Sequence, residues 1–328
     1  MISKRQEEIL KVIVEEYIKS AKPVGSESIC NNMKCSSATV RNEMAELEDM
    51  GFLEKTHISS GRVPSEKGYR YYVDSLMKPK NMSGEEMLKL QTIFKNTELD
   101  LNDVITRSIE IISEITAYTS VVLGDSSSEK LKKVEVIPLN DVDLVAIVVT
   151  DKGHTENKKI TLSRIDINDI KKMVDLINEL LVGTPIDEVS SKLEFEIKPV
   201  IGKYVKQHEM IYNAFYNAFS DFAKSSSSCY FAGKTNILKQ PEFNDSDKIR
   251  NIINKFEDKN IVDNIEETNN GINIYIGSES KLDNDVTVIK TKYDTEDGEG
   301  TIAIIGPKRM EYSKVVSLLE YIKKEIER

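Results

Sequence analysis

SSATVRNEMAELEDMGF, residues 36–52, begins with small hydroxyl side chains and continues as an amphipathic segment. Serine is favoured at the start of a helix, and a glycine such as Gly51 is favoured directly after its end. Apolar residues at helical spacing predict one buried face: Val40, Met44 and Leu47. The stretch therefore predicts a helix whose polar first half, including Arg41, faces away from the core.

The flanking segments predict a winged helix-turn-helix domain around this helix. Apolar residues three and four apart predict a first helix over residues 4–20, and Ser26 should cap a short second helix that ends near residue 32. After the central helix, FLEKTHI and Val63-Pro64 are short strands on either side of an SSGR turn, and Ser65 caps a further helix. Three helices followed by a strand pair with a glycine-containing tip is the order in which the third helix enters the major groove of DNA.

The composition is that of a folded globular protein of 328 residues, enough for two or three domains. Hydrophobic residues make up 39% of it, and no run approaches the ~18 apolar residues of a membrane span. The chain starts without a signal-peptide pattern and has three cysteines, which allow no even disulfide framework, so we expect a cytoplasmic protein with no membrane partner. Cys30 and Cys35 have no histidine near them, which favours small apolar groups over a zinc site.

The charge is unevenly distributed along the chain, whose formal net charge is -10. The segment 1–80 carries 13 Lys and Arg against 12 Asp and Glu, whereas the remainder carries 32 against 43. An acidic protein has no general attraction for phosphate, so any contact with nucleic acid must be local. The asymmetry favours the segment 1–80 as the part that meets a polyanion.

No motif indicates catalysis, a metal or a cofactor. Gly233-Lys234-Thr235 lacks the glycine that a phosphate-binding loop has five residues earlier, because Ser228 stands there. The three histidines lie in separate regions, which gives little support for a metal site or a catalytic triad. We therefore expect a binding protein that is not an enzyme and needs no metal and no cofactor.

After residue 80, the pattern predicts connecting helices followed by an α/β region. Residues 81–122 are mostly helical in pattern, with isoleucines three and four apart. KVEVIPL, DLVAIVVT and ENKKITL predict three strands, of which the second, a continuous apolar run, should be central. Residues 163–225 return to helix, and strands follow up to a closing helix from Tyr312 to about Glu327. The simplest arrangement is one mixed sheet interrupted by a helical insert.

The polar side of the central helix and the tip of the wing provide the candidate DNA contacts. Arginine fits O6 and N7 of guanine, asparagine fits N6 and N7 of adenine, and hydroxyls near a helix N-terminus suit phosphate. The helix supplies Ser37, Thr39, Arg41 and Asn42, and the wing supplies Ser59, Ser60, Gly61 and Arg62. The acidic end of the helix, residues 46–49, should point away from DNA.

Two alternatives stay open at this point. A winged helix can also dock onto another protein, in which case the exposed polar helix is a protein contact. Three tyrosines suggest a stacking platform for single-stranded nucleic acid: Tyr69, Tyr71 and Tyr72. Helical spacing places at least Tyr69 and Tyr72 on one face with apolar residues, which favours core packing instead.

Three blocks of the sequence closely resemble the HrcA family, the heat-inducible transcription repressors of bacteria. They are KPVGSESI at residues 22–29, the stretch over residues 36–76, and GEGTIAIIGPKRMEYSKVVSLLEYI at residues 298–322. The resemblance runs over essentially the whole chain and is strongest in the segment 1–80. It implies an α+β multidomain fold with four segments: a winged-helix DNA-binding domain at 1–80, connecting helices at 81–122, a GAF-like α/β domain made of 123–162 and 226–328, and a helical dimerisation insert at 163–225.

The resemblance also implies partners and regulation. It implies a homodimer that binds double-stranded DNA at the CIRCE inverted-repeat operator and represses chaperone operons of the groE and dnaK type. It implies that repression is lost on heating. The GroEL chaperonin is the implied modulator, which keeps the repressor in its active form.

The aromatic run IYNAFYNAF offers apolar anchors for the dimer interface: Tyr212, Phe215, Tyr216 and Phe219. The same run can form the core of its own domain, and the two alternatives are equally compatible with the sequence. A GAF-like domain can also bind a small molecule. The sequence contains no charged or aromatic cage for one, so ligand sensing stays open.

Overall fold

The computed structural model describes residues 2–33, 35–55, 61–97, 99, 101–124, 129–151, 153, 155–162, 166–203, 208–225, 229–257, 271–295 and 298–328, with the backbone only for residues 31, 32, 102, 187, 208 and 221–225. The chain divides into two compact units. The first comprises residues 1–123, 229–295 and 299–328, and the second comprises residues 124–228 and 296–298.

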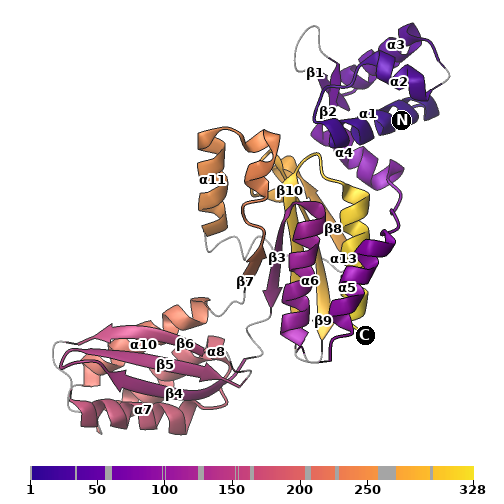
Figure 1. Cartoon of the computed structure of the whole chain (residues 1–328). Helices are drawn as coiled ribbons and strands as arrows, with labels where there is room; N and C mark the ends of the chain where they lie inside the picture. The colour runs from indigo at the N-terminus through magenta and orange to yellow at the C-terminus, as the bar shows by residue number, and fades with distance from the viewer. Residues whose placement is uncertain are drawn as a thin grey trace. The chain divides into compact units, whose positions relative to one another are not determined.

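The first unit begins with a winged helix-turn-helix (Figure 1). Its elements follow in the predicted order: α1 (Lys4–Ser20), α2 (Ser26–Asn32), α3 (Ser37–Asp49), β1 (Leu53–Lys55), β2 (Arg62–Pro64), α4 (Glu66–Tyr71) and the π-helical turn η1 (Tyr72–Leu76). Strands β1 and β2 pair antiparallel and form the wing. Residues 56–60, which connect them in the sequence, lie outside the described residues. The predicted winged-helix order is confirmed.

Local sequence explains where α3 begins and ends. The Ser36 hydroxyl accepts a hydrogen bond from the Thr39 amide at 3.2 Å and caps the first turn. Gly51 follows the helix with a φ of +78°, a left-handed conformation that glycine adopts without strain. Between these two positions the predicted apolar face is buried in the winged-helix core: Val40, Met44 and Leu47.

A five-stranded sheet forms the body of the first unit, in the order β7 (Cys229–Ala232), β3 (Thr119–Gly124), β10 (Gly298–Pro307), β9 (Val286–Thr295) and β8 (Ile272–Ile276). One face carries α5 (Gly84–Phe94), α6 (Leu101–Thr116) and α13 (Tyr312–Ile326), and the other carries α11 (Ser246–Glu257) and the 3-10 turns η4 (Ile237–Lys239) and η5 (Pro241–Phe243) (Figure 1). Residues of β9 alternate accordingly: Ile289 and Tyr293 lie in the first apolar cluster, and Val286 and Val288 lie in the second.

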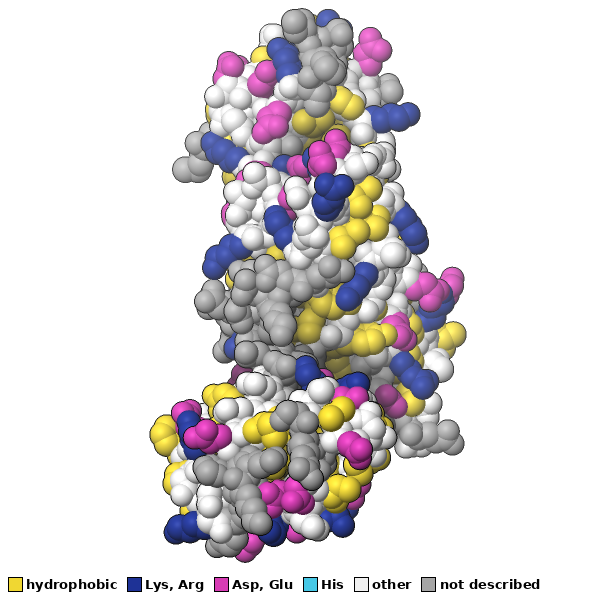
Figure 2. Space-filling view, turned by 90° about the vertical axis from the view of Figure 1, so that its left-hand side faces the viewer, with side chains coloured by type: hydrophobic (Ala, Val, Ile, Leu, Met, Phe, Trp, Pro, Cys, Tyr) yellow, Lys and Arg dark blue, Asp and Glu magenta, His cyan; other side chains and the backbone are white. Residues whose placement is uncertain are grey.

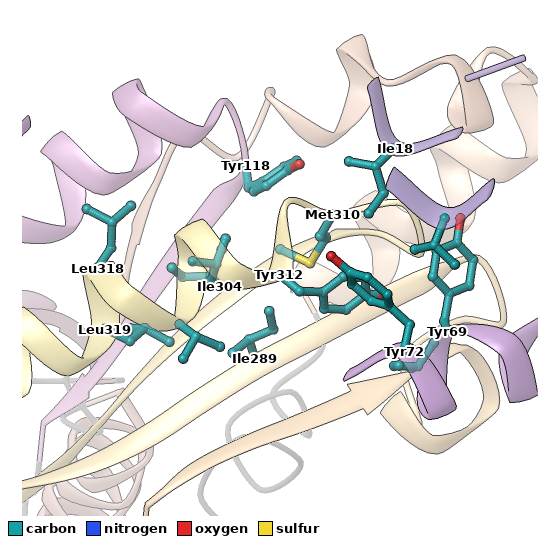
Figure 3. Close-up of a cluster of buried hydrophobic side chains, with 14 of the residues drawn as sticks. Ile18, Tyr69, Tyr72, Tyr118, Ile289, Ile304, Met310, Tyr312, Leu318 and Leu319 are labelled. Carbon is teal, nitrogen blue, oxygen red and sulfur yellow. The ribbon is translucent and has the colours of Figure 1, made fainter. Parts of the chain in front are cut away.

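Tyrosine side chains join the winged helix to this sheet body (Figure 3). Tyr69 of α4 and Tyr72 of η1 lie against Tyr312 of α13, with ring centroids 6.0 and 6.5 Å from its ring. Ile18, near the end of α1, and Met310 belong to the same buried cluster. Tyr69 and Tyr72 are only 2% and 5% exposed, so the core-packing alternative is correct for both of them.

The second unit is a three-stranded sheet packed against helices. Its strands lie in the order β4 (Leu131–Pro138), β5 (Asp143–Thr150) and β6 (Thr155–Thr161), and both pairs are antiparallel. Its helical elements are α7 (Ile167–Leu181), α8 (Ile186–Lys192), the π-helical turn η3 (Leu193–Ile197), α9 (Lys198–Ile201) and α10 (His208–Ser225). Alternate residues of β5 are buried against the helices: Leu144, Ala146 and Val148. The prediction that this strand is central is confirmed.

Two predictions about the region after residue 80 are wrong. The strands over residues 131–161 do not join the C-terminal strands but form their own sheet, so the second unit begins near residue 124 and not at 163. A hydrophobic pattern identifies a strand but not its partner in a sheet. The predicted helical connection to residue 122 is also too long, because α6 ends at Thr116 and Ala117 adopts a φ of +57°. The following residues form β3, which is buried on both faces.

Candidate nucleic-acid interface

Four predicted DNA contacts lie on the first two turns of α3: Ser37, Thr39, Arg41 and Asn42. Arg41 and Asn42 are exposed, and Ser37 and Thr39 are half-buried. The Thr39 hydroxyl lies 2.9 Å from the Ser36 hydroxyl, so a pair of hydrogen-bonded hydroxyls lines the start of the helix. The first N–H groups of a helix have no acceptor within it, and together with these hydroxyls they suit a phosphate oxygen.

The second half of α3 is tied to α1 by its carboxylates. Glu43 pairs with Arg5 at 3.3 Å, and Glu46 accepts a hydrogen bond from Gln6 at 2.8 Å. Glu43 and Glu46 are therefore both engaged in contacts within the domain. The polar start of α3, and not its acidic end, is therefore the part available to a polyanion.

Arg41 lies in a cluster of hydroxyls between α2 and α3. Its Nε donates a hydrogen bond to Ser26 Oγ at 3.2 Å, and Ser26 Oγ lies 3.0 Å from Ser37 Oγ. The prediction that Ser26 caps α2 is wrong, because Gly25 occupies the cap position and the Ser26 side chain contacts α3. The sequence does not indicate this contact, because Ser26 and Arg41 lie fifteen positions apart on two different helices.

The backbone of the wing is fixed on the connection between α1 and α2. Gly61 lies against Val24, and a Cβ at Gly61 would be 2.3 Å from the Val24 carbonyl oxygen. Arg62 and Val24 exchange two backbone hydrogen bonds of 2.8 and 2.9 Å. Gly61 is therefore required for a close backbone approach. The remaining wing predictions, Ser59 and Ser60, lie outside the described residues.

The side chain of Arg62 is engaged within the domain. Its Nε binds Glu48 Oε2 of α3 at 2.6 Å, and the Arg62 side chain is only 14% exposed. Lys55 of β1 lies 3.6 Å from the same carboxylate. This geometry favours a role in fixing the wing to α3 over the predicted contact with DNA. Glu48 is the partner that the sequence did not reveal, since it belongs to the acidic end of α3, which was expected only to point away from DNA.

The surface gives no long-range electrostatic signal on the face shown in Figure 2. The described lysines, arginines, aspartates and glutamates are interspersed there, with no extended patch of one sign among them. A mixed surface of this kind does not attract a polyanion from a distance. On this face, the described charges therefore form no patch that would attract nucleic acid from a distance.

The aromatic residues predicted as dimer anchors lie in the core of the second unit. Tyr212, Phe215 and Phe219 are 4%, 0% and 2% exposed. Tyr216 is half-buried and stacks on Tyr212, with ring centroids 5.8 Å apart. The dimer-anchor prediction is therefore wrong for the three buried residues, and the intradomain alternative holds for them. Helical spacing of aromatic residues is the same for a core face and an interface, so the pattern alone does not separate the two.

Within the described ranges, no group of three or more His, Cys, Asp and Glu side chains is arranged to hold a metal ion. His57 and His154 lie outside these ranges. Cys30 and Cys35 are half-buried and pack against the winged-helix core. Among all the residues that the structure describes, no helix has both the length and the apolar character needed to cross a membrane.

A solved structure shares the fold of this chain. A crystal structure of a hypothetical protein at 2.2 Å resolution matches 100% of this chain and 98% of its own length, with a TM-score of 0.64 and 22% identity, and it supports the fold alone. A crystal structure of an IclR family transcriptional regulator from Brucella abortus matches 98% of this chain and 89% of its own. Its TM-score of 0.23 at 12% identity is too low to indicate a shared fold.

Sequence comparison is more specific. A family model described as "Winged helix-turn-helix transcription repressor, HrcA DNA-binding" matches residues 1–74, and one described as "HrcA protein C terminal domain" matches residues 102–316. The heat-inducible transcription repressor HrcA of Bacillus pumilus is 42% identical over 334 residues, which cover 99% of this chain and 97% of that protein. The chain therefore belongs to the HrcA family of heat-inducible transcription repressors, with a DNA-binding winged helix at its N-terminus.

Proposed function

We propose that this chain is a dimeric repressor that binds the CIRCE inverted repeat in the bacterial cytoplasm and represses chaperone operons of the groE and dnaK type. The observation that carries the proposal is the exposed polar start of α3, with Arg41 and Asn42 on the side opposite the buried face. This arrangement fits a helix that enters the major groove better than it fits protein docking, because the buried centre of a protein interface is enriched in aromatic and apolar side chains, and the start of α3 exposes polar ones. The proposed activity uses no catalytic residue and no cofactor.

Each side chain at this site has a proposed role. Arg41 donates two hydrogen bonds to guanine, and Asn42 hydrogen-bonds to adenine. Ser37 and Thr39, with the first amides of α3, bind a backbone phosphate. The wing contacts the adjacent DNA backbone, and Ser59 and Ser60 are its proposed contact residues.

An inverted repeat requires two copies of the winged helix related by a two-fold axis. We propose that the second unit mediates dimerisation and that the five-stranded sheet with its helices is the GAF-like domain. Several apolar side chains of the second unit are exposed and available to a partner copy: Ile137, Leu139, Ile167, Leu180, Val182 and Phe195. Phe195, at 76% exposed, is the largest of them, and it replaces the buried aromatics of α10 as the candidate anchor.

The heat response follows from stability. A repressor whose folded dimer is only marginally stable loses its operator when it partly unfolds, and it then exposes apolar surface. The GroEL chaperonin binds such surfaces and returns the chain to its active form. Heat occupies the chaperonin with other unfolded proteins, so active repressor is depleted and the operons are transcribed.

The experiment that tests the dimeric mode uses duplexes in which neither, one or both halves of the repeat are scrambled. Fluorescence anisotropy should show that scrambling one half lowers affinity about a hundredfold or more, because one recognition helix then lacks its site. Sedimentation should show two chains on the intact repeat. Equal affinity for the intact and half-scrambled duplexes would contradict a two-fold repressor.

A second arm of the experiment adds GroEL and ATP to protein that has been heated and cooled. The proposal predicts that operator binding recovers only with chaperonin and ATP present. Recovery at the same rate in their absence would remove the chaperonin from the mechanism and leave the DNA-binding proposal intact.

A further inference from the structure

We propose that Ser26 is a positioning residue for Arg41, which orients the guanidinium so that its two terminal nitrogens face a base. The inference rests on the proposed function and deepens it, because it assigns part of the sequence specificity to a residue that touches no DNA. Ser26 lies on α2 and acts on α3, so it also joins the two helices of the helix-turn-helix.

Three features of Ser26 support this role. The residue is 9% exposed, which places its hydroxyl in the interface between the helices and not at the surface. Its side chain does not cap its own helix, since Gly25 is the N-cap residue. Instead, Ser26 Oγ accepts the Arg41 Nε hydrogen at 3.2 Å and lies 3.0 Å from Ser37 Oγ. A hydroxyl in this interface with two partners on α3 is held in one place.

The geometry has a consequence for how Arg41 can bind. A guanidinium offers either its end, through both Nη groups, or its side, through Nε and one Nη. Because Nε is hydrogen-bonded to Ser26, the end remains for two hydrogen bonds with guanine O6 and N7. A long side chain also loses conformational freedom when it binds, and an arginine already fixed at Nε loses less of it.

The Ser26 hydroxyl also leaves the positive charge of the Arg41 guanidinium intact. Serine accepts a hydrogen bond without neutralising the guanidinium, whereas a carboxylate in the same place would compete with DNA. The Ser26 hydroxyl thus fixes the direction of Arg41 while its attraction for the polyanion is retained.

A double-mutant cycle tests the inference: Ser26→Ala and Arg41→Lys, singly and together, in the full chain. Lysine keeps the charge but carries all its donors on one nitrogen, so it cannot be held at Ser26 by one nitrogen while two others contact guanine. A matched control is Ser28→Ala, since Ser28 lies on the same helix and its hydroxyl donates to Glu16 at 2.5 Å and not to α3. The readouts are anisotropy with the intact and the scrambled repeat, the salt dependence of each, and the thermal midpoint.

In the wild-type background, Ser26→Ala should reduce the preference for the intact repeat about tenfold for the dimer. Its affinity for scrambled DNA and its salt slope should not change. In the Arg41→Lys background, Ser26→Ala should have no further effect, and Ser28→Ala should leave the preference unchanged in both backgrounds.

Equal losses in the two backgrounds would overturn the inference, because a merely structural serine acts independently of Arg41. An unchanged preference in Ser26→Ala would overturn it as well. Failure of the proposed function looks different: the wild-type protein itself would then bind intact and scrambled duplexes equally.

Discussion

Arg41 differs in its contacts from the other arginines of the winged helix. Arg5, Arg62 and Arg70 each pair with a carboxylate. Among the described residues, the partner of Arg41 is the neutral hydroxyl of Ser26. A carboxylate would have to be displaced before an arginine could bind phosphate or guanine. We therefore expect Arg41, more than the other arginines of this domain, to bind DNA.

Replacement of Arg41 by alanine should cost about 1–3 kcal/mol of operator affinity, because a bidentate contact with a base is lost. The thermal midpoint should stay unchanged, since the side chain is exposed. Anisotropy with the intact repeat measures the first quantity. Arg107→Ala is the matched control: it removes the same charge from an exposed position of α6 and should leave affinity within experimental error. Equal losses in both variants would mean that only net charge matters.

At the scale of single residues, sequence predicts what depends on neighbours in the chain. The buried face of α3, its cap at Ser36 and the left-handed Gly51 were all predictable, because propensity and capping act over a few residues. The roles of Ser26 and Arg62 were not, because their partners lie on other elements. From residue type alone, Ser26 was predicted to cap α2 and Arg62 was predicted to contact DNA.

Among the elements, the wing and α3 are joined by the Arg62–Glu48 pair. Arg62→Ala and Glu48→Ala should each destabilise the winged helix by about 1 kcal/mol, at the upper end for such pairs because both side chains are mostly buried. Since the wing is positioned by this pair, both variants should weaken operator binding to a similar extent. Urea unfolding and anisotropy measure the two effects.

A double-mutant cycle separates positioning from contact. In a positioning role the double variant is about as impaired as either single variant. If Arg62→Ala weakens DNA binding and Glu48→Ala does not, Arg62 contacts DNA directly.

The helices α5 and α13 are joined by an ion pair that makes stability depend on pH. Lys314 Nζ lies 2.8 Å from Glu86 Oε1. This hydrogen bond, together with hydrogen bonds from Ser83, lowers the pKa of Glu86 from 4.5 to about 2. A carboxylate whose pKa is lower in the folded state stabilises the fold above its unfolded pKa, and this contribution is lost as the pH falls below about 4.5 towards 2.

Glu86→Gln should therefore lower the urea midpoint at pH 7, and the difference from wild type should shrink between pH 4.5 and 3. Glu85→Gln is the control, since the Glu85 side chain is 81% exposed and its ion pair of 3.6 Å contributes little. A difference between wild type and Glu86→Gln that stays constant down to pH 3 would contradict the assignment.

In the whole molecule, the orientation of the winged helix depends on its contacts with the sheet body. Arg309 binds Glu242 and Gln240 and donates a hydrogen bond to the carbonyl oxygen of Ile18, in the last turn of α1, at 3.3 Å. Its side chain is 13% exposed and that of Glu242 is 22% exposed. A cation at this position satisfies a helix C-terminus and favours the docked state.

Arg309→Ala should destabilise this contact by about 1–3 kcal/mol, because it leaves partly buried acceptors without a donor. Hydrogen exchange should then increase in α1 and α4 more than in the second unit. Arg328→Ala provides the comparison, since that side chain is 78% exposed and pairs with Glu325 at 3.8 Å. Equal exchange in α1 for wild type and Arg309→Ala would contradict the contact.

For the whole molecule, the sequence predicted individual elements and the winged helix better than it predicted which strands pair in a sheet. The winged helix and the central position of β5 were correct, because each depends on local pattern. Assignment of the strands over residues 131–161 to the main sheet was wrong, since any exposed strand edge can in principle pair with any other. Which strands pair is decided by packing of distant segments, and hydrophobic periodicity contains no information about it.

The most direct measurement is a salt titration of binding to the CIRCE duplex and to a scrambled duplex by fluorescence anisotropy. We expect a preference of about a thousandfold or more for the intact repeat, with log affinity falling linearly against log salt as several phosphates are neutralised. Equal weak binding to both duplexes at every salt concentration, with GroEL and ATP present, would contradict it.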